Sequence, residues 1–82
     1  MDLRRWAIVY VATVSGEDSD EIDCDAPMQV YDFDSVDAVE MALEFEKTFE
    51  TRADPEWFMK GEQSLSVLIS TLEEARKAPP AS

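Results

Sequence analysis

The sequence predicts a two-layer α+β fold in which an antiparallel sheet of two to three strands packs against two main helices. Apolar residues recur with a period of two before residue 34 and with helical spacing after it, and a hydrophobic content of 45% supplies a core. A chain of 82 residues is the size of one small domain. We therefore expect a single globular domain over residues 1–78 and a C-terminal tail over residues 79–82.

The strands are predicted in the first 33 residues. Residues 4–14 place apolar side chains on both faces of an extended chain, which is typical of a central strand. Residues 21–26 alternate strictly between apolar and acidic side chains, which predicts a half-buried strand. Pro27 cannot donate to a ladder, so it either separates these residues from a third strand over residues 28–33 or kinks one long strand.

A first helix is predicted to begin at Asp34-Ser35, an N-cap site, and to end near Arg52. Asp37 lies early enough to favour the positive end of the helix dipole. Apolar residues occupy one broad arc of this helix and polar residues the opposite side. The apolar arc is expected to cover the sheet.

The rest of the chain predicts a short helical turn and a second long helix. Asp54 and Pro55 have the residue types of an N-cap and a first helical position, and Gly61 stops the turn. Ser64 is placed to cap the last helix, in which apolar residues recur every three or four positions. The predicted core comprises Ile8, Tyr10, Val30, Phe33, Val39, Leu43, Phe49, Leu68 and Leu72.

The negative charge is concentrated in one region. The net charge is −12, and the stretch from Trp6 to Glu46 contains neither Lys nor Arg. A surface of this sign repels phosphates, so we expect a basic protein partner rather than nucleic acid or a membrane. The candidate partner-binding residues are Glu17, Asp18, Asp20, Glu21, Asp23, Asp25, Asp37, Glu40, Glu44, Trp57 and Phe58.

Six of the acidic candidates are predicted to form two rows: Glu21, Asp23 and Asp25 on the second strand, and Asp37, Glu40 and Glu44 on the first helix. Their spacing is of the same order as that of every first or second phosphate along a DNA strand. The alternative is a solvated face that keeps a small protein soluble. Trp57-Phe58-Met59 is the other candidate contact, because three large apolar residues in one short turn cannot all face the core. The alternative is that they plug the gap between the helices and the sheet.

The residues that most enzymes need are missing from the sequence. Without histidine, no Ser-His or Cys-His pair can activate a nucleophile, and two glycines do not make a phosphate-binding loop. The acidic loop lacks the EF-hand spacing. We therefore expect no enzymatic activity, no cofactor and no metal site. The single cysteine, Cys24, excludes an internal disulfide and favours the cytoplasm.

The junction Tyr31-Asp32-Phe33-Asp34-Ser35-Val36-Asp37, together with the size and charge of the chain, resembles small acidic phage anti-CRISPR proteins of type I systems. The resemblance implies a DNA-mimicking inhibitor, a monomer or weak dimer, that acts in the host cytoplasm. It would bind a Cas surveillance complex or its nuclease and block binding of target DNA. The alternatives are an immunity protein or antitoxin that neutralises a basic nuclease, and a homo-oligomeric accessory protein.

Overall fold

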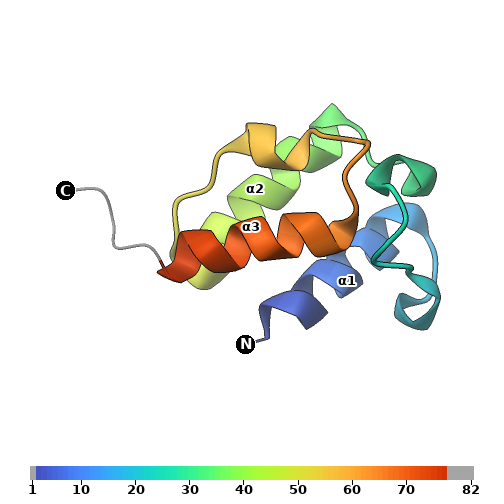
Figure 1. The fold of residues 1–82 in the computed structure, drawn as a ribbon, viewed down its shortest axis with the longest axis horizontal. Coiled ribbons are helices and arrows are strands. Elements are labelled where there is room, and N and C mark those ends of the chain that lie inside the picture. The colour runs from blue at the N-terminus through green and yellow to red at the C-terminus, as the bar shows by residue number, and fades with distance from the viewer. Residues whose placement is uncertain (1, 78–82) are drawn as a thin grey trace.

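The computed structural model describes residues 2–77, and within them the chain is helical with no β-strand. Three α-helices, α1 (Leu3–Ser15), α2 (Ser35–Phe49) and α3 (Leu65–Lys77), gather around one core (Figure 1). Three short 3-10 helices, η1 (Ser19–Glu21), η2 (Met28–Tyr31) and η3 (Pro55–Phe58), lie between them. No helix among these residues is long and apolar enough to cross a membrane. The predicted α+β fold is therefore wrong, and the predicted tail lies outside the described residues.

The predicted central strand is the helix α1, and capping residues fix both of its ends. The Asp2 side chain accepts a hydrogen bond of 3.0 Å from the Arg4 N–H group. Gly16 ends the helix in the left-handed region at φ 80°, and its N–H group donates to the Ala12 carbonyl over 2.9 Å. These are the two ends that an α-helix requires, an N-cap acceptor and a left-handed C-cap.

The side chains of α1 follow a helical period rather than a period of two. Leu3, Ala7 and Val11 are four residues apart and no more than 3% exposed. Trp6 packs edge to face against Phe49 of α2, with ring centroids 5.4 Å apart and planes at 88°. Burial of this apolar surface outweighs the modest preference of the β-branched residues for strands, because helix and strand propensities are weak beside tertiary packing.

The other two predicted strands form an irregular connection between α1 and α2. Its one extended pairing is an isolated antiparallel bridge between Pro27 and Ser64. The Met28 N–H group donates to the Gln63 carbonyl and the Ser66 N–H group to the Cys24 carbonyl, each over 2.9 Å. The connection is thereby attached to the segment that enters α3, and without a neighbouring strand no ladder can extend.

The carboxylate row predicted on the second strand is consequently not formed as a strand face. Glu21 closes η1, while Asp23 and Asp25 lie in the turn that follows. Asp23 Oδ1 accepts a 2.9 Å hydrogen bond from the Asp25 N–H group, which curls the chain locally. The regular spacing of a strand is therefore lost at these residues.

The helical elements after residue 34 confirm the sequence analysis. Asp34 caps α2, and Asp54 caps η3 with Pro55 in its first turn. Ser64 Oγ accepts a hydrogen bond of 3.2 Å from the Val67 N–H group at the start of α3. α2 ends earlier than predicted, at Phe49, because the next residue adopts a left-handed C-cap conformation.

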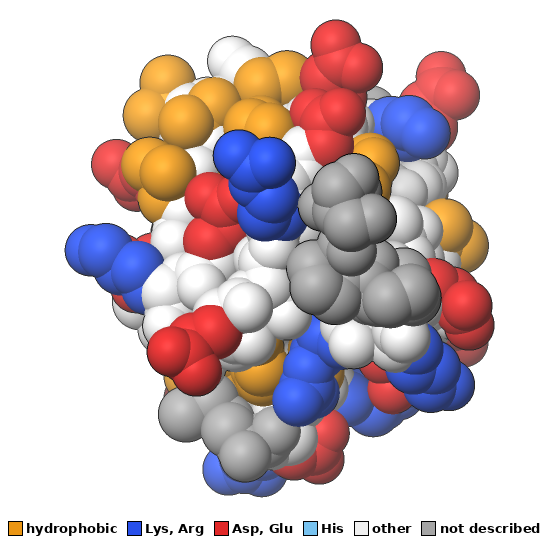
Figure 2. Space-filling model, turned by 90° about the vertical axis from the view of Figure 1, so that its left-hand side faces the viewer, with side chains coloured by type: hydrophobic (Ala, Val, Ile, Leu, Met, Phe, Trp, Pro, Cys, Tyr) orange, Lys and Arg blue, Asp and Glu red, His pale blue; other side chains and the backbone are white. Residues whose placement is uncertain are grey.

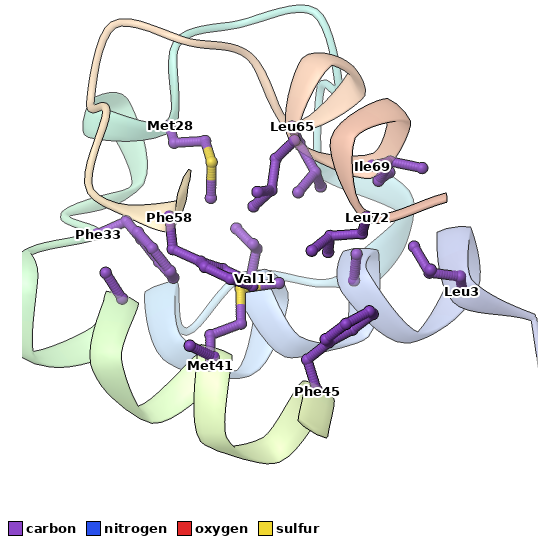
Figure 3. Packing of buried hydrophobic residues seen from close by; sticks show 14 residues of the cluster. Leu3, Val11, Met28, Phe33, Met41, Phe45, Phe58, Leu65, Ile69 and Leu72 are labelled. Atoms are coloured by element: carbon purple, nitrogen blue, oxygen red, sulfur yellow. The ribbon is translucent and has the colours of Figure 1, made fainter. Parts of the chain in front are cut away.

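The core lies between the three α-helices and η3. Figure 3 shows side chains from these elements pointing toward one another, and Phe45, Phe58, Leu68 and Leu72 are each at most 1% exposed. Of the predicted core residues, Phe33, Leu68 and Leu72 are buried, and Ile8, Tyr10 and Phe49 are half-buried. The prediction is wrong for Val30, Val39 and Leu43, which are 58%, 38% and 55% exposed, because no sheet covers that side of α2.

Candidate functional site

Ser35, the first residue of α2, is exposed and held between two aspartates. The Asp37 N–H group donates to Asp34 Oδ1 over 2.9 Å, and the Asp34 N–H group donates to Asp37 Oδ2 over 3.4 Å. This capping box satisfies two backbone donors at the helix start. Ser35 is thus carried on a well-defined helix end rather than on a loose loop.

The hydroxyl group of Ser35 is exposed and is not used as the helix cap. Within residues 2–77 its Oγ atom makes no hydrogen bond, and the chain has no histidine to act as a general base. The arrangement therefore does not support nucleophilic catalysis by this chain. The positive end of the dipole of the fifteen-residue helix α2 favours an anionic group such as a phosphate ester at this position.

The surface of α2 beyond Ser35 combines exposed apolar and acidic side chains. Val36 and Leu43 are 63% and 55% exposed, and Val39 lies between them at 38%. Their spacing of three and four residues aligns them along one side of the helix. Glu40 and Glu44 are exposed one turn apart on the same helix. We refer to these five residues as the α2 surface, which a protein approaching Ser35 along α2 would meet.

The structure places the acidic candidates on two different elements. Those of the connection between α1 and α2 are all exposed, namely Glu17, Asp18, Asp20, Glu21, Asp23 and Asp25. On α2, Glu40 and Glu44 are exposed and Asp37 is half-buried beside Ser35. The α2 residues are therefore the acidic candidates that share a helix with the available serine.

The aromatic candidates behave differently from one another. Phe58 is 1% exposed and belongs to the core, so its side chain does not present a surface. Trp57 is half-buried, and Met59 is 44% exposed. The expectation that these three consecutive apolar residues are not all buried is confirmed, because Met59 is exposed.

The basic and acidic side chains are unevenly distributed over the molecule. Figure 2 shows the end of the molecule where α3 terminates, and there Lys and Arg side chains are interspersed with Asp and Glu. Arg76 of this end lies over the ring of Phe49, 4.8 Å from its centroid. α2 starts near the other end (Figure 1), and the stretch from Trp6 to Glu46 contributes no basic residue there. The acidic residues around the start of α2 therefore have no Lys or Arg within their own stretch of the chain.

The pKa of Tyr10 in α1 depends on the acidic residues of α2. Burial raises the pKa of its phenol above 10.0, and the negative charges of Glu40, Glu44 and Asp37 raise the pKa further. Tyr10, Glu40 and Glu44 line the same hollow, which places the phenol near these carboxylates. Tyr10 therefore marks where α1 faces the acidic side of α2.

Taken together, the fold and the site define a small helical domain that presents an exposed serine at the start of its second α-helix. The family model described as phosphopantetheine attachment site matches residues 5–72, and the chain belongs to this family. No curated protein matches the chain.

This membership overturns the functional interpretation of the sequence. The chain is not an anti-CRISPR inhibitor, and a DNA-mimicking face directed at a Cas complex or nuclease is wrong, because the family carries a phosphopantetheine group in biosynthesis. The resemblance rested on size, charge and the junction around Asp34-Ser35, and size and charge are shared by unrelated small acidic proteins.

The sequence analysis interpreted Ser35 only as part of an N-cap site and did not include it among the candidate site residues. The available signal was an Asp-Ser pair at the start of an amphipathic helix, which was interpreted only as an N-cap. A serine at such a position is common for capping alone, so its type does not reveal a modification site. The distinguishing property is its exposure, with Asp34 rather than Ser35 acting as the cap.

Proposed function

We propose that this chain is a carrier protein whose phosphopantetheine prosthetic group is attached through Ser35 Oγ. The observation that carries the proposal is the exposed serine at the start of the capped helix α2, within the matched residues 5–72. Attachment would form one phosphodiester bond between Ser35 Oγ and the phosphate of the group, and it would break the pyrophosphate bond of the donor coenzyme A, with loss of the hydroxyl proton and release of adenosine 3′,5′-bisphosphate. The chain would accept the group from a separate transferase, since it has no histidine to act as a general base and the neighbouring carboxylates of Asp34 and Asp37 accept backbone hydrogen bonds.

The other serines of residues 2–77 fit attachment less well. Ser15 Oγ donates to the Ala12 carbonyl, Ser64 Oγ caps α3, and Ser66 Oγ hydrogen bonds with Asp25. Ser19 is half-buried, and Ser70 is exposed but lies within α3, away from a helix start. Ser35 combines exposure, a free hydroxyl and the positive end of a helix, and this combination suits a phosphate ester.

When bound, phosphopantetheine supplies a terminal thiol that carries acyl groups as thioesters. The residues of this chain would anchor the group on a rigid helix and leave the arm in solvent. The buried side chains of α2, including Phe45 at 0% exposure, lock that helix to the core. Carrier domains are not catalytic themselves, so the chemistry belongs to the enzymes that the carrier visits.

The partners that we infer are biosynthetic enzymes that recognise the α2 surface. An enzyme that reaches the arm on Ser35 approaches the exposed Val36, with Val39 and Leu43 further along the helix. Glu40 and Glu44 on the same helix favour Lys and Arg on the enzyme. The cytoplasmic location inferred from the single cysteine remains a prediction.

Incubation with coenzyme A and a phosphopantetheinyl transferase tests the proposal. The intact mass of the wild-type chain is expected to rise by one phosphopantetheine, and that of Ser35→Ala is expected to stay unchanged. Ser70→Ala removes another exposed helical serine and is expected to be modified as fully as the wild type. Modification of Ser35→Ala would refute the assignment.

A further inference from the structure

A groove runs between α1 and α2. Its α1 wall is formed chiefly by Trp6, Val9, Tyr10 and Val14, Glu40 lines it from α2, and its volume is about 570 Å³. Tyr10 and Glu40 also line an adjoining hollow of about 620 Å³ that extends along α2, together with Leu43, Glu44, Glu46 and Lys47. The two hollows therefore adjoin at Tyr10 and Glu40, and we refer to them together as the groove between α1 and α2.

The α1 wall of the groove is an apolar strip. Trp6, Tyr10 and Val14 are four residues apart, so they lie on one side of α1 with rises of about 6 Å between neighbours. Val9 is 42% exposed beside them. The strip therefore extends for about 12 Å, which matches two turns of a helix laid along it.

The α2 wall of the groove is acidic. Glu40 and Glu44 line it one turn apart, and with Asp37 they act electrostatically on the Tyr10 phenol. The basic residues of the lining, Arg5 and Lys47, both lie toward the end of the groove where Trp6 packs against Phe49. The middle of the groove is thus apolar on one side and negative on the other.

Charge decides which occupant fits this groove. A second copy of the chain would bring another net charge of −12 to an acidic wall, so self-association is opposed by like-charge repulsion. A segment with apolar residues for the α1 strip and Lys or Arg for the Glu40 side is complementary to both walls.

We propose that the groove between α1 and α2 binds an amphipathic helix of a partner protein, whose apolar stripe packs on Trp6, Tyr10 and Val14 and whose flanking Lys or Arg residues face Glu40 and Glu44. The lining does not include Ser35. The proposal is therefore independent of prosthetic-group attachment. The proposed site shares Glu40 and Glu44 with the α2 surface and adds the apolar strip of α1.

Two synthetic helical peptides with one shared apolar stripe provide the probe. One carries Lys and the other Glu at the flanking positions, and both are titrated into the full chain as Ser35→Ala, so that attachment plays no part. In a Trp57→Phe background Trp6 is the sole tryptophan, and its emission reports on the groove directly. The Lys peptide is expected to shift Trp6 emission and the Val9 and Val14 amide resonances saturably, and the Glu peptide to bind at least tenfold more weakly.

Matched charge variants complete the test. Glu40→Gln combined with Glu44→Gln is expected to weaken binding of the Lys peptide at least tenfold at low salt, whereas Glu73→Gln with Glu74→Gln on α3 leaves it unchanged. Circular dichroism verifies that each variant is folded. Equal binding of both peptides overturns the proposal. So does a set of shifts confined to Val36 and Val39, or concentration-dependent dimerisation through Trp6 without peptide.

Discussion

Asp34 and Asp37 exchange hydrogen bonds across Ser35, with the Asp37 N–H group 2.9 Å from Asp34 Oδ1 and the Asp34 N–H group 3.4 Å from Asp37 Oδ2. The two carboxylates satisfy the backbone while the serine between them faces solvent. Asp34 therefore caps the helix, which leaves Ser35 free for the attachment that we propose.

Asp34→Ala is expected to lower the free energy of unfolding by about 0.5–2 kcal/mol, because the N-terminal amides of α2 lose their acceptor. Urea denaturation followed by circular dichroism measures the change. Asp18→Ala is the matched control, since Asp18 precedes η1 without a side-chain cap and its loss is expected to have little effect. If both variants lose the same free energy of unfolding, the capping box of Asp34 and Asp37 contributes no stability.

Leu68→Ala is expected to cost about 2–5 kcal/mol, because its side chain is completely buried between the helices. Leu43→Ala removes the same atoms from a residue that is 55% exposed and is expected to cost no more than about 0.5 kcal/mol. If Leu68→Ala unfolds the domain, Ile69→Val at a 3% exposed position provides a milder change of about 0.5–1.5 kcal/mol. A cost for Leu43→Ala as large as that for Leu68→Ala would contradict the packing of α2.

Gly16→Ala is expected to destabilise the domain by about 1–2 kcal/mol, since Gly16 closes α1 at φ 80° and an alanine there is strained. The cost is conformational, because an added Cβ atom would meet nothing within 4 Å. Gly16→Asn is expected to cost less, as asparagine tolerates the left-handed region better. Thermal unfolding of the three proteins in parallel gives the order, and equal melting temperatures would contradict the helical C-cap.

Tyr10 is expected to make the domain less stable at alkaline pH. Burial and the α2 carboxylates raise its pKa above 10.0, so the native state keeps the phenolic proton when the unfolded chain releases it. The associated stability is fully present below the unfolded pKa and is lost as pH rises through the raised native pKa. Absorbance titration in a Tyr31→Phe background isolates Tyr10, because the chain has two tyrosines.

The midpoint of that titration is expected above 10.0 and should move down in Glu40→Gln with Glu44→Gln. Added salt should also lower it, because it screens the partly exposed carboxylates. A midpoint at or below 10.0 would contradict the placement of Tyr10 against α2.

The sequence predicted the elements whose boundaries are marked by capping chemistry. Asp34, Asp54 and Ser64 identified the starts of α2, η3 and α3, because N-cap preferences are local and strong. α1 was missed because Val and Ile alternate with other apolar residues, so both periods fit and strand propensity decided wrongly. Asp2 and Gly16, which cap the two ends of α1, are the residues from which a helix of thirteen residues could have been predicted.

The site could be predicted only in part. The acidic row of α2 and its proximity to Asp34-Ser35 can be read from the sequence. The exposure of Val39 and Leu43 cannot, because it depends on which side of α2 is covered by α1 and η3. The role that we propose for Ser35 rests on its free hydroxyl and on family membership, neither of which a helical wheel reveals.

Fragmentation mass spectrometry of the modified chain tests most directly whether phosphopantetheine is attached to Ser35. Since no Lys or Arg lies between Trp6 and Glu46, trypsin places Ser15, Ser19 and Ser35 on one peptide, and backbone fragmentation must separate them. If the group is attached to Ser35, the added mass is expected on every fragment that contains Ser35 and on none that ends before it. Added mass on Ser15, Ser19 or any serine of α3, or an unmodified chain under conditions that fully modify a reference carrier protein, would contradict it.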